Sequence, residues 1–285
     1  MTPIIIPSTY NYIAIFLTFA CNLKCSYCIN AHSKIDRKRR LLSGQEWVEA
    51  LGRIVTRSDL PITFGGGEPT LHPDFYYIVK ELHRKNVPMD LLTNCQFEVD
   101  EFMENVSSSI FKRPAPYASI RVSYHSKTMD LFSLLKKVCV LRDDGYSIGI
   151  WSVNHPLYES NIELCQYLCH KLDIDFRLKE FLGIHNGKSY GTYKYPNACN
   201  SDIRKEVMCK TSELIVGPDG NVYRCHADLY EQRWHIGNIM DDNFDIKDEY
   251  LPCDKFGSCN PCDQKLKYNR FQEKGHCSVS IKEVE

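Results

Sequence analysis

The sequence has no apolar stretch long enough to cross a membrane. The longest, Ile13–Ala20, has eight residues, whereas a helix that spans a bilayer needs roughly 20. A secretory signal is also missing, because no Lys or Arg precedes Lys24 to form its positive first part. The formal net charge of -1 gives no excess of positive charge, which excludes general nucleic-acid binding. We therefore expect a cytoplasmic protein that binds neither membranes nor nucleic acids in general.

The composition is that of an ordinary globular protein, with one exception. Of the 285 residues, 43% are hydrophobic and 25% are charged, and this length suffices for one large domain and a small second one. The exception is cysteine, with 14 residues. In a cytosolic chain of this size, so many cysteines indicate metal or redox chemistry rather than disulfides.

Strands and helices alternate over the first two thirds of the chain. Hydrophobic patterning predicts strands at 12–19, 61–64, 89–93, 119–124, 147–153 and 175–179, and helices at about 43–55, 74–85, 129–144 and 162–172. Such alternation implies a parallel sheet. Six parallel strands form an open barrel or a doubly wound sheet, and in both architectures the chemistry collects at the carboxyl ends of the strands.

The alternation stops near Gly183, where a stretch rich in Gly, Asn, Tyr and Lys leads into a cysteine-dense tail. We place the domain boundary there and expect domains at 1–185 and 186–285. Within the tail, Glu213–Val216 and Asn221–Arg224 flank a Gly-Pro-Asp-Gly turn. This pattern predicts a β-hairpin.

Three cysteines, Cys21, Cys25 and Cys28, fall within eight residues directly after the first predicted strand. At this cysteine content such a spacing arises by chance about 0.03 times per chain. Three thiolates on one short loop suit an iron-sulfur cube with one iron left open for a substrate or cofactor. The alternatives are that the three cysteines are reduced thiols without a metal, or that they form part of a zinc site, which prefers four ligands and no open position.

This CxxxCxxC pattern resembles that of the radical S-adenosylmethionine (radical SAM) superfamily. The resemblance extends to Tyr27, an aromatic position that lies against the adenine of SAM in that family. It also includes a Gly-Gly-Glu-Pro motif after the second predicted strand, formed here by Gly66, Gly67, Glu68 and Pro69. In that family, the backbone and the carboxylate of this motif receive the methionyl amino group of SAM. Glycine suits this role because a backbone without a side chain permits close approach; taken alone, the motif is also compatible with a simple turn.

The resemblance implies an α/β fold with a partial (β/α)6 barrel, a [4Fe-4S] cluster on the three clustered cysteines, and SAM as cofactor. Polar residues at later strand ends, Ser123 and Asn154, are candidates for contact with the SAM ribose or carboxylate, although such residues also serve as caps and turn formers. Cys95, at the end of the third strand of the barrel, is a candidate catalytic hydrogen donor. We favour a packing role for it at the wall of the substrate pocket, because buried cysteine is more often packing than chemistry.

The tail resembles the SPASM and twitch extensions that carry auxiliary [4Fe-4S] clusters. Their opening pattern is met by Cys209, Gly220 and Cys225, but the order of the later cysteines departs from the full SPASM pattern. The remaining candidate ligands are Cys199, Cys253, Cys259, Cys262 and Cys277. In one arrangement, Cys253, Cys259, Cys262 and Cys277 hold one cluster, and Cys199, Cys209 and Cys225 form an incomplete set of three ligands for a second. Alternatively, a single twitch-like cluster pairs Cys209 and Cys225 with Cys259 and Cys262, or the same four thiolates hold a structural zinc.

The implied reaction is reductive cleavage of SAM to a 5′-deoxyadenosyl radical that abstracts hydrogen from a substrate, with an electron donor such as flavodoxin or ferredoxin. An auxiliary cluster that accepts an electron favours net oxidation. Because only 20 residues precede Cys21, we expect a small-molecule or sugar-type substrate rather than a peptide. The alternatives are a peptide-modifying maturase or epimerase, and a non-catalytic iron-sulfur or zinc protein for electron transfer or binding. The glycine motif argues against the last of these.

A basic run follows the first cysteines and consists of Lys34, Arg37, Lys38, Arg39 and Arg40. Such a run is usually a solvated face. Near the mouth of a barrel it would also attract an anionic substrate, such as a phosphorylated sugar or nucleotide.

Overall fold

A computed structural model describes residues 2–29, 40–267 and 276–284. Its centre is a nine-stranded sheet in the order β14-β13-β12-β2-β4-β5-β6-β7-β8. Six successive strands are parallel to one another: β2 (Tyr12–Thr18), β4 (Ile62–Gly66), β5 (Met89–Thr93), β6 (Ile120–Tyr124), β7 (Ile148–Asn154) and β8 (Asp175–Glu180). The expected α/β architecture with a mostly parallel sheet is therefore confirmed.

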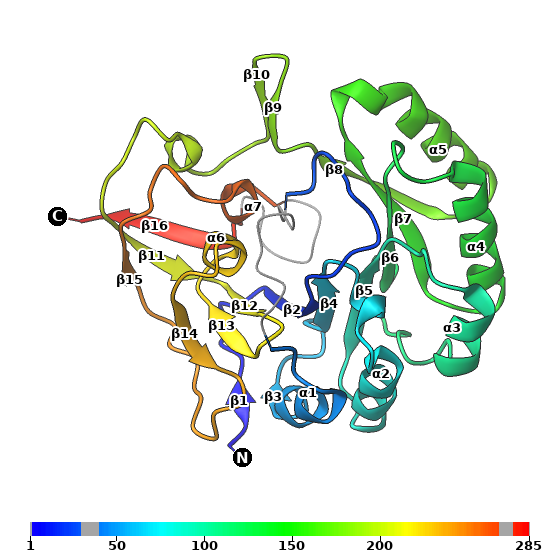
Figure 1. The fold of residues 1–285 in the computed structure, drawn as a ribbon, viewed down its shortest axis with the longest axis horizontal. Coiled ribbons are helices and arrows are strands. Elements are labelled where there is room, and N and C mark those ends of the chain that lie inside the picture. Colours follow the sequence, from blue (N-terminus) through cyan, green and yellow to red (C-terminus); the bar gives the residue numbers. More distant parts are fainter. Residues whose placement is uncertain (1, 30–39, 268–275, 285) are drawn as a thin grey trace.

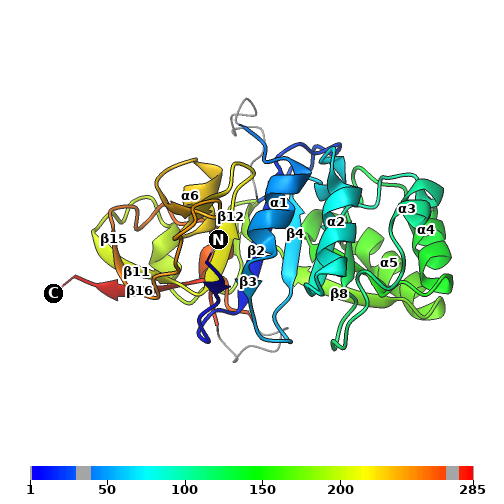
Figure 2. The same cartoon turned by 90° about the horizontal axis from the view of Figure 1, so that it is seen from below.

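Helices cover one face of this parallel part (Figures 1 and 2). They are α1 (Gly44–Leu51), α2 (Phe75–Arg84), α3 (Val99–Asn105), α4 (Leu131–Asp143) and α5 (Glu159–Lys171). The sequence pattern predicted all of them except the short α3. Helix α1 begins where expected because Ser43 and Glu46 form a capping box, in which the Ser43 hydroxyl accepts from the Glu46 N–H and Glu46 accepts from the Ser43 N–H.

Strand β2 is buried on both of its faces. Ile13, Ile15 and Leu17 pack on the helical side in the main core, together with the fully buried Trp47 of α1. Ala14 and Phe16 point to the other side, where residues of the C-terminal part cover them. The first strand is therefore held between the two parts of the chain, and so is the loop that follows it.

The predicted hairpin is confirmed by antiparallel pairing of β12 (Glu213–Val216) with β13 (Asn221–Tyr223), and β14 (His235–Asn238) extends it. Unexpectedly, β12 also pairs in parallel with β2. The tail thus continues the central sheet, because the apolar Leu214 and Ile215 lie next to Ile13 and Ala14 of the first strand. A domain boundary near residue 185 stays a prediction.

The remaining elements are short. A three-stranded antiparallel sheet has the order β15 (Leu251–Cys253), β11 (Val207–Thr211), β16 (Val279–Glu283). Figure 1 shows it beside the helices α6 (His226–Tyr230) and α7 (Pro261–Gln264). The others are β1 (Ile4–Ile5), β3 (Ile54–Val55), β9 (Gly183–His185), β10 (Lys188–Tyr190), η2 (Pro69–Leu71), η3 (Pro156–Tyr158) and η4 (Pro196–Cys199). Among the described residues, no helix is both long and apolar enough to cross a membrane.

Candidate functional site

The loop 21–28, which we call the cluster loop, leaves the carboxyl end of β2 and carries Cys21, Cys25 and Cys28, all partly exposed. The Cys21 sulfur accepts a hydrogen bond from the Leu23 N–H at 3.4 Å, and the Cys28 N–H donates to the Cys25 carbonyl at 3.2 Å. Burial and the nearby Cys28 and Cys21 thiols raise the pKa of Cys25 to about 11, against a partial lowering by Thr128. The loop therefore carries three thiols within eight residues, and their binding of an iron-sulfur cluster stays a prediction.

The glycine motif packs directly against the start of the cluster loop. The Gly67 N–H donates to the Thr18 carbonyl at 2.9 Å, and the Glu68 N–H donates to the Ala20 carbonyl at 2.8 Å. Gly66 has φ +123, and a Cβ on Gly67 would lie 2.0 Å from the Ala20 oxygen. These glycines are therefore required by close approach to the chain that leads into Cys21, a reason that the sequence analysis did not foresee.

The Glu68 carboxylate points into the protein and is only 1% exposed. Its oxygens accept hydrogen bonds from the Thr70 hydroxyl at 2.8 Å, the Thr93 hydroxyl at 2.8 Å and the Asn94 N–H at 2.7 Å. Burial raises the pKa of Glu68, while these donors oppose that shift. Binding of the methionyl amino group by this carboxylate stays a prediction. In the structure, the hydrogen bonds of Glu68 connect the end of β4 to the end of β5. The adjacent Pro69 is buried at the start of η2.

Asn94 connects Glu68 to the cluster loop by hydrogen bonds, and the sequence analysis did not identify it. Its backbone N–H binds Glu68, and its side-chain amide donates to the Asn22 side chain at 2.7 Å. Asn22 directly follows Cys21. The available signal was its position directly after β5, where parallel sheets place functional side chains.

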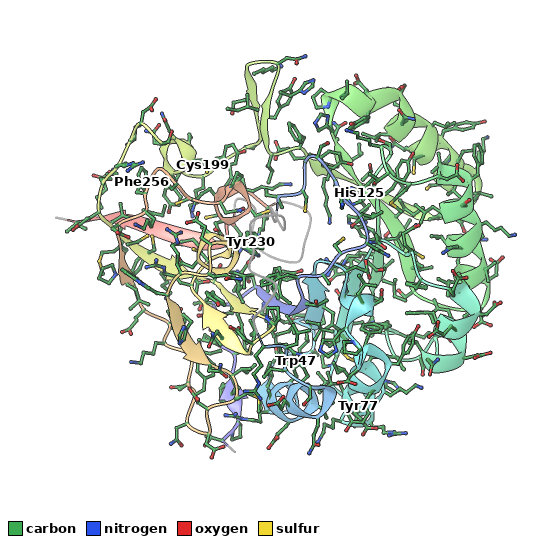
Figure 3. All side chains as sticks on the ribbon, viewed as in Figure 1. Trp47, Tyr77, His125, Cys199, Tyr230 and Phe256 are labelled. Atoms are coloured by element: carbon green, nitrogen blue, oxygen red, sulfur yellow. The ribbon has the colours of Figure 1, made fainter. Side chains whose placement is uncertain are left out.

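A group of aromatic and histidine rings lies at the carboxyl ends of β6, β7 and β8. The Tyr27 hydroxyl is 3.1 Å from Nδ1 of His125, and its ring is 5.2 Å from His155 and 6.0 Å from Tyr158 between centroids. Burial and the nearby Lys179 lower the pKa of His125 to about 4, so this imidazole is neutral at pH 7. Figure 3 labels His125 on this side of the molecule.

The sequence analysis missed the two histidines, although His125 directly follows a predicted strand and His155 lies two residues after another. The residues chosen instead at these ends are close neighbours of this ring group: Ser123 is half-buried on β6, two residues before His125, and the exposed Asn154 precedes His155. Their contact with SAM stays a prediction.

The structure places Cys95 in the packed interior of the protein, while a role at the wall of the substrate pocket or as a hydrogen donor stays a prediction. Its side chain is 0% exposed and belongs to the main hydrophobic core. Burial raises the pKa of this thiol to about 12. Its backbone adopts φ 57 after β5, so the chain turns the side chain into the core, where it packs.

In the C-terminal part, Cys209, Cys225, Cys253 and Cys259 line one pocket, which we call the cysteine pocket. They come from β11, the N-cap of α6, β15 and the loop before α7. The Cys225 sulfur accepts from the Asp228 N–H at 3.4 Å. Across the described ranges, no three His, Cys, Asp or Glu side chains converge on a point that could hold a metal ion.

The other candidate cysteines are not among the residues that line this pocket. Cys199 ends η4, where Figure 3 labels it, and Cys277 directs its thiol to the Val279 carbonyl at 3.0 Å. Cys262 lies on α7 next to Asp263. Neither of the two ligand sets proposed from the sequence therefore coincides with the four cysteines of the pocket.

The cysteine pocket adjoins the cluster loop. The side-chain amide of Asn260, which caps α7, donates to the Ile29 carbonyl at 3.4 Å. Phe16 of β2 packs against Tyr230 of α6 at 5.9 Å between ring centroids, and Figure 3 labels Tyr230 near the centre of the molecule. Residues that neighbour the two thiol-rich sites along the chain are thus in direct contact.

Of the predicted basic run, Lys34, Arg37, Lys38 and Arg39 lie outside the described residues. Arg40 forms an ion pair with Glu46 at the start of α1. This pairing identifies Arg40 with the solvated face that such a run usually forms.

Comparison with known proteins agrees with this geometry. Residues 15–115 match the family model "Radical SAM superfamily". Over 272 residues, the chain is 23% identical to the mycofactocin maturase MftC of Mycolicibacterium smegmatis, covering 79% of this chain and 66% of MftC. The chain thus spans slightly less than two thirds of that relative.

Two solved structures share the fold. SuiB of Streptococcus suis, bound to the precursor peptide SuiA, superposes with a TM-score of 0.52 at 16% identity, over 85% of this chain and 63% of SuiB. The protein anSMEcpe, with bound AdoMet and the Cp18Cys peptide, gives a TM-score of 0.55 at 17% identity, over 81% and 77% of the two chains. Residues 15–115 are thus similar to the radical SAM superfamily, and the two solved structures share the fold of the chain.

Proposed function

We propose that the cluster loop holds a [4Fe-4S] cluster on Cys21, Cys25 and Cys28 and that SAM binds beside it. The observation that carries this proposal is the interlock of the cluster loop with the Gly66–Glu68 turn, next to the Tyr27 ring group. When bound, cluster and SAM supply a 5′-deoxyadenosyl radical that abstracts hydrogen from a substrate. The chain itself positions the thiols, orients SAM and shields the reaction.

The residues divide these tasks by position. The backbone of Gly66 and Gly67 with Glu68 receives the methionyl amino group, and Tyr27 lies against the adenine. Ser123 and Asn154, at the ends of neighbouring strands, bind the ribose or carboxylate. His125 and His155, whose pKa values are lowered by burial, complete a wall of aromatic rings without adding charge near the radical.

The finer architecture belongs to the same proposal. The six parallel strands β2 to β8 form a partial (β/α)6 barrel over about residues 1–185. The cysteine-rich remainder forms a SPASM- or twitch-like domain with an auxiliary [4Fe-4S] cluster. Four thiols that line one pocket support the auxiliary cluster.

For the substrate, the comparisons favour the peptide alternative over the small-molecule or sugar substrate expected from the sequence. The relatives include a maturase and structures solved with peptides. Strand β8 forms the edge of the sheet beside the ring group, and an extended peptide adds readily to such an edge. We infer an oxidation of a peptide side chain, in which a flavodoxin or ferredoxin would supply the electron for SAM cleavage and the auxiliary cluster would accept the electron that the substrate radical loses.

Anaerobic reconstitution with SAM and dithionite tests the core of this proposal. The protein should form 5′-deoxyadenosine, and the triple variant C21A/C25A/C28A should form none. That variant should lose about four irons and keep the auxiliary iron. Release of 5′-deoxyadenosine by the triple variant would refute the assignment of the cluster loop.

The substrate class is tested with the intact enzyme. Synthetic peptides of 10 to 20 residues should raise 5′-deoxyadenosine formation above the rate without substrate, whereas sugar phosphates and nucleotides should not. Stimulation by the second set alone would establish the small-molecule function instead.

A further inference from the structure

The inner face of the parallel sheet, opposite the covering helices, carries cationic side chains on its last strand. Successive side chains of a strand point to opposite faces. Phe176 of β8 packs against the main core on the helical side, so Asp175, Arg177 and Lys179 lie on the inner face. Strand β8 therefore presents two cations and one carboxylate on this face.

Closer to the amino ends of the strands, the neighbouring strands add further positive charge to the same face. Arg121 of β6 lies between Ile120 and Val122, which both pack in the main core, so its side chain points to the inner face. It shares the buried Asp90 of β5 with Arg113, at 3.2 Å and 2.8 Å. The buried Nε of Arg121 has no hydrogen-bond partner among the described residues. One carboxylate thus serves two guanidinium groups, and this face favours an anion.

Arg177 is held in a fixed position. Its Nε donates to Asp175 at 3.1 Å and its Nη2 donates to the Pro116 carbonyl at 2.5 Å. The guanidinium lies 5.8 Å from the centre of the Trp151 ring, a neighbour on the same face. Nevertheless 31% of the side chain is exposed. The guanidinium is therefore both positioned in advance and accessible to a ligand.

Lys179 lies two residues closer to the carboxyl end of β8, between Arg177 and the ring group. It is half-buried and lies in register with Val153 of β7. Burial and the charge of Lys179 lower the pKa of His125, which indicates that the ammonium group is near this ring. Two cations at alternate positions of a strand have Cα atoms about 7 Å apart and repel each other. An anion bound between them is therefore attracted by both.

The geometry points to a carboxylate-binding subsite formed by Arg177 and Lys179, which selects substrate peptides with an acidic side chain. This inference rests on the peptide substrate of the proposed function and deepens it. Among the described residues, β8 is the last strand of the sheet. A peptide strand that adds to β8 places every second side chain on the inner face, beside these two cations. Cross-strand pairs of opposite charge stabilise such an arrangement.

The register also predicts a spacing in the substrate. An Asp or Glu beside Lys179 is followed on the same face by the side chain two residues further toward the carboxyl end of β8. That side chain is level with Phe181, whose ring lies 4.3 Å from His155 of the ring group between centroids. The residue that loses hydrogen is therefore two positions from the acidic residue.

The subsite is tested by retention of peptides on the immobilised enzyme, reconstituted anaerobically with iron, sulfide and SAM. A library of random decapeptides is applied, and the retained peptides are sequenced by mass spectrometry. Wild-type protein and K179R should enrich Asp and Glu about fivefold, as an ion pair at a partly exposed site allows. K179Q should show no enrichment, and K179E should enrich Lys and Arg instead. K136Q, at an exposed position on α4, is the matched control and should behave as the wild type. Equal enrichment of Asp and Glu by wild type and K179Q would overturn the subsite.

Two further measurements identify the carboxylate that is bound. Enrichment of Asp and Glu should be the same with C-terminally amidated and free-acid libraries, and retention that requires the free terminus would overturn the assignment to an acidic side chain. SAM affinity, measured by equilibrium dialysis, should be the same in K179Q and wild type. A fall in SAM affinity that parallels the loss of enrichment would assign Lys179 to the SAM carboxylate instead.

Retention and reaction together separate this inference from the proposed function. If wild-type protein forms 5′-deoxyadenosine with peptides but shows no preference for acidic ones, the subsite fails and the radical SAM function stands. If it forms none, yet retains acidic peptides through Lys179, the proposed reaction fails and the subsite stands. Where both hold, the mass change in the product should lie two residues from Asp or Glu, and a change at another spacing would overturn the predicted register.

Discussion

The two thiol-rich sites of this protein are built in opposite ways. The cluster loop takes all three cysteines from eight consecutive residues and leaves them partly exposed. The cysteine pocket takes its four from separate elements spread over residues 209–259, and Cys209 and Cys253 are buried. The first site therefore depends on a short local sequence, whereas the second forms only after β11, β15, α6 and α7 have packed together.

Each site is also supported by hydrogen bonds to one buried carboxylate. Glu68 supports the cluster loop through Thr93 and Asn94 of the adjacent strand. Asp263 supports the cysteine pocket, because it accepts hydrogen bonds from the His226 N–H at 3.0 Å, the His226 ring at 2.8 Å and the Ala227 N–H at 3.2 Å. If the two sites are built independently, removing one carboxylate should damage only its own site.

The largest effect is expected for Asp263→Ala. This change leaves the buried His226 ring and two backbone N–H groups without their acceptor, which costs about 4 kcal/mol and lowers Tm by roughly 8 °C in a chain of this size. Auxiliary iron should be lost, while the iron of the cluster loop and 5′-deoxyadenosine formation persist. Asp202→Ala, at an exposed position, is the control. Equal loss of iron from both sites would contradict the independence of the two sites.

Glu68→Ala should affect only its own site, with a slightly smaller loss of stability, about 3 kcal/mol, because its donors retain one another as neighbours. We expect weaker SAM binding, measured by equilibrium dialysis, with the cluster-loop iron and the auxiliary iron both retained. SAM affinity that stays at the wild-type value would show that Glu68 only braces the strands.

The same contrast explains what the sequence could predict. The strand and helix alternation, the hairpin and the cluster loop depend on neighbours within a few residues, so periodicity and spacing revealed them. The pairing of β12 with β2 and the choice of pocket cysteines depend on contacts between residues about 200 and about 50 positions apart. Spacing rules could name Cys209, Cys225 and Cys259, but not their association with Cys253, because that depends on the register of β11 with β15.

Cys95→Ala tests a thiol that belongs to neither site. Its deletion from the main core should cost about 1–2 kcal/mol, seen as a lower urea midpoint with an unchanged m-value. The iron content and the reaction product should remain those of the wild type, since the thiol packs in the core. Cys139→Ala, at a half-buried position, should cost less. A changed product would return Cys95 to the reaction.

Asn94→Ala should act on the cluster loop alone and by a smaller amount. The variant loses the side-chain contact with Asn22 but keeps the backbone bond to Glu68, so we expect a loss of about 1 kcal/mol, equivalent to a roughly fivefold slower formation of 5′-deoxyadenosine. Iron content should not change, and the exposed Asn161→Ala serves as the control. A rate equal to that of the control would exclude Asn94 from positioning the loop.

The smallest expected effect is a pH dependence in the region around the glycine motif. His72 is buried after η2, where Nε2 donates to the Leu42 carbonyl at 3.0 Å and Nδ1 accepts from the Asp74 N–H at 3.1 Å. Burial lowers the pKa of His72, against weaker opposing effects of the hydrogen bond to Leu42 and of the charge of Asp74. A base with a depressed folded-state pKa contributes its full stability above its ordinary pKa near 6.5, and that contribution is lost as the pH falls below this value.

Protonation of His72 would also break the bond from Asp74, because both ring nitrogens would then be donors. The wild-type Tm should therefore fall more steeply than that of His72→Gln between pH 7 and pH 5. In the C-terminal part burial opposes the charge of His226, yet Asp263 raises the pKa of His226, so its contribution to stability runs the other way and is lost as the pH rises. Because His226 is present in both proteins, the difference between their Tm profiles isolates His72, and parallel profiles would show that its neutral form does not matter for stability.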